Sequence, residues 1–337
     1  MFLKIWKEIK NKKFAPLYLL YGKEEFLIEE TKNLIIREAL EDDTIDLNLN
    51  TYDMEEINVA AAIEDCETIP FFGERKIVIV QNPFFLTAEK GKEKIEHDLP
   101  VLENYITNPV PTTILIIIAP YEKLDERKRL TKALKKQAVV LDAQELSEKD
   151  TIQWIRQYID ERGGKIQLAA AEKIFQMVGP HLGLIHHELN KLLLYADDVE
   201  IDDMMVEELV ARSLEENIFS LVDHVVKKRL DHVLEIYSDL LKLNEEPIKI
   251  TALIASQLRL LYQVKTLLKK GYSQNQIASR LKVHPYRVKL AMGKAKQFSL
   301  QKILEMLEDL AEIDYQMKTG GGDKEKLLEL FFVKHIH

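Results

Sequence analysis

The chain has 337 residues, of which 46% are hydrophobic and 31% are charged, with a net charge of −9 and one cysteine, Cys66. These values are ordinary for a globular protein of roughly two or three domains, and they exclude a collagen-like or low-complexity chain. One cysteine excludes an internal disulfide and a four-cysteine metal site, and no apolar run approaches the ~18 residues of a membrane span, so we expect a cytoplasmic protein in a reducing compartment.

The first 141 residues alternate strand and helix signals. Near-continuous apolar runs predict buried strands, and apolar residues at helical spacing predict helices between them. The expected strands are 15–21, 46–52, 76–80, 113–118 and 138–141, and the expected helices are 25–40, 55–66 and 125–136. Five strands with helices between them indicate a parallel, doubly wound α/β domain.

Strand signals stop after residue 141. Ser147 and Asp150 form an S-x-x-D capping box, which predicts a helix that ends at Gly163 and Gly164. Further helices are expected at about 168–178, 183–196 and 202–211, and amphipathic helices fill the remaining residues. The predicted fold is therefore α/β plus all-α, with an α/β domain at 1–141, a small helical domain at 142–211 and a larger helical domain at 212–337.

The acidic net charge hides a basic region. Residues 212–337 carry a net charge of +5, and the stretch 247–304 contains twelve Lys and Arg but no Asp or Glu. Such a stretch predicts a surface for an acidic partner, either phosphate or an acidic protein, although a solvated helical face is the alternative. The candidate contact residues are Lys265, Lys269, Lys270, Arg280, Lys282, Arg287 and Lys289.

An α/β domain followed by a small helical domain is the arrangement of many nucleotide-binding ATPases. Their phosphate-binding loop needs G-x-x-x-x-G-K-[ST], because glycine lets backbone N–H groups surround the phosphates. The loop after Gly22 lacks the second glycine and is followed by four glutamates, and strand 76–80 ends in Gln81 and Asn82 in place of an acidic pair for magnesium. We therefore expect no ATP hydrolysis. The alternative is an active ATPase that uses an unorthodox site.

Two further patterns carry weaker signals. The histidines His181, His186 and His187 have spacings of five and six residues and no cysteine nearby, so a zinc site is not expected. Residues 274–291 resemble a helix-turn-helix, with small apolar residues at the packing positions, but Lys282 stands where glycine is usual. A helix-turn-helix type of DNA-binding regulatory protein is therefore the alternative function.

Two adjacent phenylalanines, Phe71 and Phe72, lie in a loop shaped by Pro70 and Gly73. Neighbouring side chains of a loop cannot easily both point into one core. One interpretation buries one ring and leaves the other beside it. The other makes the pair, with Ile69, an exposed apolar contact for a pocket of a partner protein.

Taken together, these segments resemble the delta subunit family of bacterial DNA polymerase III. The similarity begins with YLLYGKEEFLIEE at 18–30 and TIPFFGERK at 68–76. It continues through 123–128, 179–182, 188–192, 216–223, 283–288 and 314–320, and so covers essentially the whole chain.

The resemblance implies a degenerate AAA+ module followed by a helical collar, without a cofactor or catalytic residues. Such a chain is a non-catalytic subunit of a DNA-directed DNA polymerase holoenzyme. It is expected to bind and open the beta sliding clamp, with Phe71 and Phe72 at the position of the family's hydrophobic pair and Ile69, Pro70 and Gly73 beside them. The implied partners are the clamp, the delta prime and gamma/tau clamp-loader subunits, and primer–template DNA, with no membrane.

Overall fold

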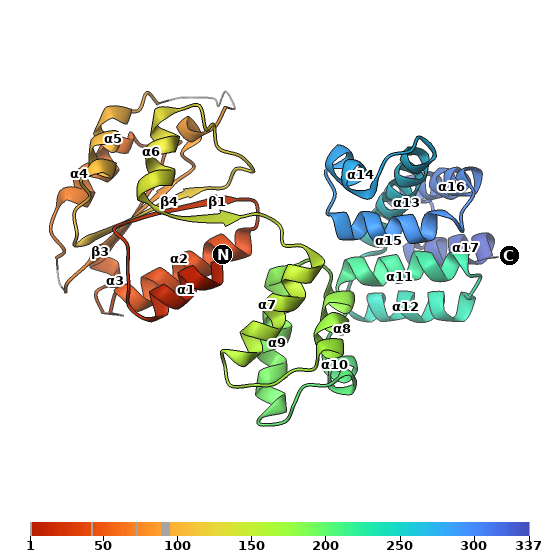
Figure 1. Cartoon of the computed structure of the whole chain (residues 1–337). Coiled ribbons are helices and arrows are strands. Elements are labelled where there is room, and N and C mark those ends of the chain that lie inside the picture. Colours follow the sequence, from red (N-terminus) through yellow and green to blue (C-terminus); the bar gives the residue numbers. More distant parts are fainter. Residues whose placement is uncertain (1, 42, 72, 89–94, 337) are drawn as a thin grey trace. The chain divides into compact units, whose positions relative to one another are not determined.

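The structure, a computed structural model, describes residues 2–41, 43–71, 73–88 and 95–336. The chain folds into two compact units, Met1–Glu145 and Leu146–His337 (Figure 1). Within the described ranges, no helix is long and apolar enough to cross a membrane.

The first unit contains a five-stranded parallel sheet of strand order β2-β3-β4-β1-β5. This confirms the predicted parallel α/β architecture. The strands are β1 (Leu17–Gly22), β2 (Leu49–Asp53), β3 (Lys76–Gln81), β4 (Thr113–Ala119) and β5 (Val139–Ala143). The helices are α1 (Phe2–Lys10), α2 (Glu25–Ala39), α3 (Ile45–Asn48), α4 (Val59–Glu67), η1 (Phe84–Leu86), α5 (Leu99–Thr107) and α6 (Arg129–Gln137).

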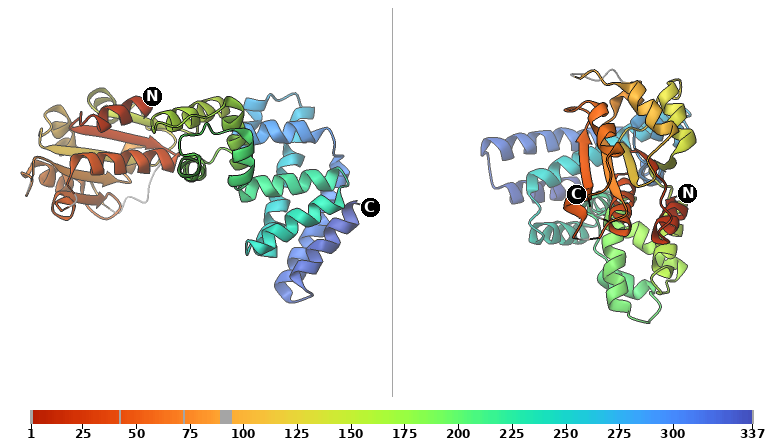
Figure 2. Two further views of the ribbon diagram at one scale, coloured as in Figure 1. Left: turned by 90° about the horizontal axis from the view of Figure 1, so that it is seen from below. Right: turned by 90° about the vertical axis from the view of Figure 1, so that its left-hand side faces the viewer.

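Helices cover both faces of this sheet, which explains why its central strands read as unbroken apolar runs. Side chains alternate between the two faces along each strand. Leu17, Leu19 and Tyr21 of β1 pack in one core with residues of α4, α5 and α6. The other face is covered by α1 and α2 (Figures 1 and 2).

The structure corrects three of the predicted boundaries. The strand expected at 46–52 is shorter, because residues 45–48 form helix α3. The helix expected from residue 55 begins at Val59, since the side chain of Asn58 caps it by accepting a hydrogen bond from the N–H of Ala60 at 2.9 Å. The helix expected from residue 125 begins at Arg129. Helices α1 and α5 had no counterpart among the predicted elements.

The second unit is helical throughout, as the sequence predicts. Ser147 begins its first helix, and its hydroxyl accepts a hydrogen bond from the N–H of Asp150 at 3.2 Å, which confirms the predicted capping. The first four helices are α7 (Glu148–Asp160), α8 (Leu168–Val178), α9 (Leu182–Ala196) and α10 (Asp203–Leu209). They are followed by α11 (Leu214–Val226), α12 (Leu230–Lys242), α13 (Pro247–Lys269), α14 (Gln274–Leu281), α15 (Pro285–Ala295), α16 (Leu300–Thr319) and α17 (Lys324–Ile336).

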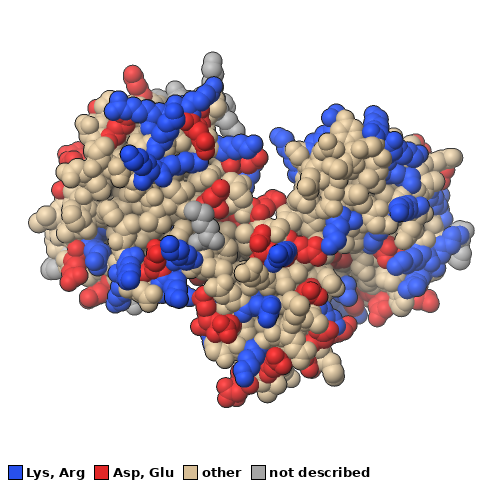
Figure 3. Space-filling model, viewed as in Figure 1, with Lys and Arg blue, Asp and Glu red and all other residues tan. Residues whose placement is uncertain are grey.

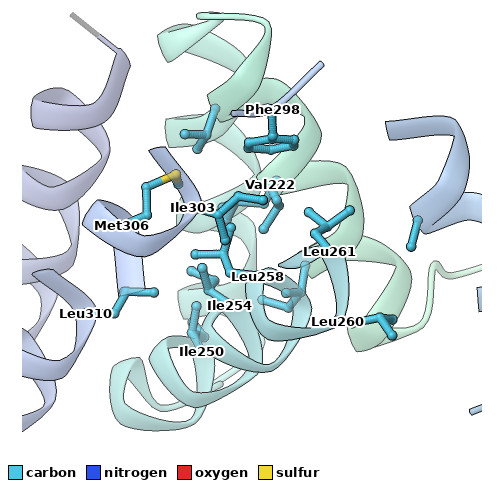
Figure 4. Packing of buried hydrophobic residues seen from close by; sticks show 14 of the residues in the cluster. Val222, Ile250, Ile254, Leu258, Leu260, Leu261, Phe298, Ile303, Met306 and Leu310 are labelled. Carbon is cyan, nitrogen blue, oxygen red and sulfur yellow. The ribbon is translucent and has the colours of Figure 1, made fainter. Parts of the chain in front are cut away.

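The long helix α13 organises the core of the C-terminal helices. Ile250, Ile254 and Leu258 lie one turn apart on a single stripe of α13, and all three are buried. Figure 4 shows this stripe packed with Val222 of α11 and with residues of α16. Burying such aliphatic side chains stabilises the fold by roughly 1.5–3 kcal/mol each.

Candidate functional site

The 69–73 loop lies between α4 and β3, at the amino end of β3. Ile69 is 85% exposed and Phe71 is 71% exposed, which is unusual for large apolar side chains so close together. Pro70 is half-buried and Gly73 is exposed, whereas Phe72 lies outside the described residues. The described part of the loop therefore presents apolar side chains to solvent.

A buried lysine fixes the base of this loop. Lys76, the first residue of β3, is 4% exposed. Its ammonium donates to Asp65 Oδ1 at 2.6 Å, to the carbonyl of Asp65 at 2.8 Å and to the hydroxyl of Thr68 at 2.7 Å. All three donors of the ammonium are thus used, and they join the end of α4 to the start of β3. Such a base holds the two ends of the loop at a fixed separation.

A second contact positions the loop from the side. The backbone N–H of Phe71 donates to Asn48 Oδ1 at 2.9 Å, and the Asn48 side chain is buried. Asn50 also donates to Asp65 Oδ2 at 2.9 Å, which ties β2 to the same base. Neither contact could be read from the sequence, because the partners lie 23 and 15 residues apart.

The segment after β1, where an ATPase would hold phosphate, is built from Gly22 and Glu24 in this chain. A Cβ on Gly22 would lie 2.0 Å from the carbonyl oxygen of Ala143, so this glycine serves the close approach of β1 to β5. Glu24 stands at the N-terminus of α2, where its carboxylate accepts a hydrogen bond from the N–H of Phe26 at 3.3 Å. This carboxylate places a negative charge at the helix N-terminus, and that charge disfavours the binding of a phosphate there.

The end of β3 offers an amide in place of an acidic pair. Asn82, with a backbone φ of 54°, donates through its side chain to Asp53 Oδ2 at 2.9 Å. Asp53 ends the neighbouring strand β2, and its carboxylate already accepts a hydrogen bond within the protein. Among the described residues, no group of three or more His, Cys, Asp or Glu side chains could hold a metal ion.

The seven basic residues singled out in the sequence fall into two groups. Three are engaged inside the second unit: Arg287 pairs with Glu215 at 2.7 Å, Lys289 pairs with Glu148 at 2.7 Å, and Lys265 donates to the carbonyl of Ala295. The other four are exposed near the C-terminal ends of α13 and α14, namely Lys269, Lys270, Arg280 and Lys282. In Figure 3 basic side chains are scattered over this part of the surface.

The helix-turn-helix alternative is not supported. Helices α14 and α15 do form a pair, with Lys282 in the left-handed conformation at a φ of 54° where glycine is usual. However, Arg287 and Lys289 of the second helix, which would have to contact DNA, form ion pairs with Glu215 and Glu148.

The ion pair between Arg287 and Glu215 belongs to a polar cluster that the sequence did not reveal. Glu215 Oε2 lies 3.2 Å from His181 Nε2, at the start of α9, and 2.7 Å from Arg287 Nη1 of α15. The hydrogen bond to Glu215 raises the pKa of His181, against desolvation and the positive charge of Arg287. The hydrogen bond from His181 in turn lowers the pKa of Glu215. The cluster joins the start of α9 to α11 and α15.

We expect this pair to contribute most to stability in mildly acidic solution. The contribution of His181 is complete below its ordinary pKa of 6.5 and is lost as pH rises through its raised pKa. That of Glu215 is complete above its ordinary pKa of 4.5 and is lost as pH falls through its lowered pKa. An NMR titration of the His181 ring should give a higher pKa in the wild type than in a Glu215→Gln variant. Equal values would show that the hydrogen bond is absent in solution.

Family models match the chain along nearly its whole length. The model of the DNA polymerase III delta subunit matches residues 18–144, and that of its C-terminal domain matches residues 215–335. A model described as a middle domain matches residues 147–208.

Individual relatives agree with these family models. The chain is 49% identical over 337 residues to DNA polymerase III subunit delta of Bacillus subtilis, covering 99% of this chain and 96% of the relative. It is 24% identical over 326 residues to a probable DNA polymerase III subunit delta of Aquifex aeolicus, covering 95% and 91%. The solved structure of the Bacillus subtilis DNA clamp loader delta protein matches with a TM-score of 0.88 at 48% identity, covering 100% of this chain and 99% of that one. With the sheet order, these matches confirm the predicted fold class, a parallel α/β domain followed by a helical region, as in the delta subunit family.

Proposed function

The chain belongs to the DNA polymerase III delta subunit family, whose members are clamp loader proteins, and from this we propose that it binds and opens the beta sliding clamp through the 69–73 loop. One observation carries the proposal: Ile69 and Phe71 are exposed on a loop whose base is fixed by the buried Lys76. A rigid loop loses little conformational entropy on binding, so more of the energy of apolar burial remains as affinity.

Clamp opening then requires only a difference in affinity. A ligand that binds the open ring better than the closed ring shifts the population toward the open state. The energy would come from burial of the loop's apolar side chains, and no hydrolysis at this chain is needed. We propose that ATP bound to gamma/tau subunits controls access to the loop, and that primer–template DNA triggers release of the clamp.

We also propose that this chain is a non-catalytic, cytoplasmic subunit of the polymerase holoenzyme and that its isolated form neither binds nor hydrolyses ATP. Three features support this proposal. The second glycine of the P-loop motif is missing after Gly22, and the carboxylate of Glu24 stands at the N-terminus of α2. The side chain of Asn82 donates a hydrogen bond to Asp53. Calorimetric titration with Mg-ATP should give no binding heat, with an intact P-loop ATPase as the positive control. Affinity in the micromolar range would contradict the proposal.

The C-terminal helices, predicted as the 212–337 domain, are proposed to join the chain to delta prime and gamma/tau. The exposed residues Lys269, Lys270, Arg280 and Lys282 are proposed to contact an acidic surface of the loader or its DNA. Reversing these four charges in the full chain should weaken loader assembly or the stimulation of the loader by DNA. Pull-down of the loader and DNA-stimulated loader activity distinguish the two contacts. If neither changes, these side chains form only a solvated helical face.

A further inference from the structure

The 69–73 loop and helix α3 lie at the same end of the sheet, where the strands begin. Helix α3 precedes β2 and the loop precedes β3; α3 and β3 are labelled in Figure 1. The two strands are parallel neighbours, and Leu49 lies opposite Ile77. Asn48, the last residue of α3, accepts the hydrogen bond from the N–H of Phe71 at 2.9 Å. This bond places α3 directly beside the exposed part of the loop.

One more apolar side chain is exposed at this end of the sheet. Leu47 precedes Asn48 on α3 and is 49% exposed. A single exposed leucine needs no explanation, but Leu47 is the chain neighbour of Asn48, whose side chain contacts the backbone of the exposed Phe71. The apolar surface therefore includes a contribution from α3 as well as from the loop.

The segments that form this surface carry several exposed carboxylates. Asp43 and Asp46 lie just before α3 and on it, Glu64 and Glu67 lie on α4, and Glu74 directly follows the loop. The two cations that come next in the chain are engaged with neighbouring groups. Lys76 is buried against Asp65, and the Arg75 guanidinium lies over the Phe14 ring at 5.1 Å and 3.7 Å from Glu74. The surface is therefore apolar at its centre and negative around it.

We propose that Leu47, Ile69 and Phe71 form one contact surface, and that its acidic surround is matched by Lys or Arg flanking an apolar pocket on the partner. The inference rests on the proposed function, so the partner is the beta sliding clamp. Charges around an interface act mainly on the association rate and its salt dependence, whereas the buried apolar centre acts mainly on dissociation. The two parts of the surface can therefore be tested separately.

The acidic surround is tested by reversing Glu67 and Glu74 together to lysine in the full chain. The association rate constant with purified beta clamp should fall about tenfold at ~0.05 M salt, and this difference should shrink at ~1 M salt, where charges are screened within ~3 Å. The matched control reverses Glu55 and Glu56, two exposed glutamates that follow β2 and so lie at the opposite, carboxyl end of that strand. It changes the net charge equally and should leave the association rate near that of the wild type.

The contribution of α3 is tested by Leu47→Ala. Removing this side chain from an apolar contact should raise the Kd about tenfold, mainly through faster dissociation. Ile57→Ala is the matched control, because Ile57 is also exposed but follows β2, at the opposite end of that strand from α3. Melting temperatures of both variants should equal that of the wild type.

The outcomes separate this inference from the proposed function. If the wild type binds the clamp and Phe71→Ala abolishes binding, but Leu47→Ala and the reversed glutamates behave like their controls, the composite surface is wrong and the proposed function stands. Faster association after reversal would mean that the partner's flank is acidic, which also overturns the inference. If the folded wild type does not bind the clamp at all, the proposed function itself fails.

Discussion

Replacing Phe71 and Phe72 together with alanine is expected to lower the affinity for the beta clamp by roughly a hundred- to several-thousand-fold. Each aromatic side chain that enters an apolar pocket contributes about 1.5–3 kcal/mol of transfer free energy. Allowing for non-additivity, the pair should contribute on the order of 3–5 kcal/mol, which corresponds to that range of Kd. Equilibrium binding of the full-length variant to purified clamp measures the loss.

The same variant should keep a near-native melting temperature, because Phe71 is 71% exposed and contributes little to the core. Leu194→Ala is a suitable control, since Leu194 is a large exposed side chain on α9 of the second unit. It should change neither clamp affinity nor melting temperature. If the phenylalanine variant instead melted early and bound the clamp normally, the pair would belong to the core and not to the contact surface.

Lys76→Met is expected to lower the free energy of unfolding of the first unit by about 3–5 kcal/mol. Removing one partner of a buried ion pair leaves the other charge without compensation, and such losses are large. Here Asp65 would lose its ammonium partner at 2.6 Å, and Thr68 would lose its contact at the base of the 69–73 loop. Urea unfolding measures the change.

The control for this variant is Lys123→Met, at an exposed lysine of the same unit. It should stay within about 0.5 kcal/mol of the wild type, as surface substitutions usually do. A Lys76→Met protein as stable as the control would show that the Lys76–Asp65 pair does not hold the loop. The two variants should therefore differ in kind. The phenylalanine variant should lose affinity for the clamp, whereas Lys76→Met should lower the free energy of unfolding.

Features with a local signal were predicted well from the sequence. The apolar runs of β1, β3 and β4 and the Ser147 cap each depend on neighbouring residues, and the structure confirms them. Helix α3 was missed because four residues give too short a period to separate a helix from a strand. The missing P-loop motif predicts a degenerate nucleotide site, which stays a prediction; the structure shows that Glu24 caps α2 at that point.

The base of the 69–73 loop could not be predicted, since it depends on residues brought together only by folding. Asn48 contacts Phe71 across 23 residues, and Lys76 contacts Asp65 across two different elements. The contacts of the acid-free stretch 247–304 could not be predicted for the same reason. Arg287 and Lys289 seemed available because no acid lies near them in the chain, yet their partners come from 72 and 141 residues away.

The central claim is that this chain opens the clamp without nucleotide, and release of the beta clamp from circular DNA tests it most directly. Purified full-length chain would be added to clamps loaded on nicked circular DNA, in the absence of ATP. The account predicts that the wild type releases the clamps and that the Phe71→Ala/Phe72→Ala variant does not. Clamps that are bound by the wild-type chain but remain closed on the DNA would contradict it.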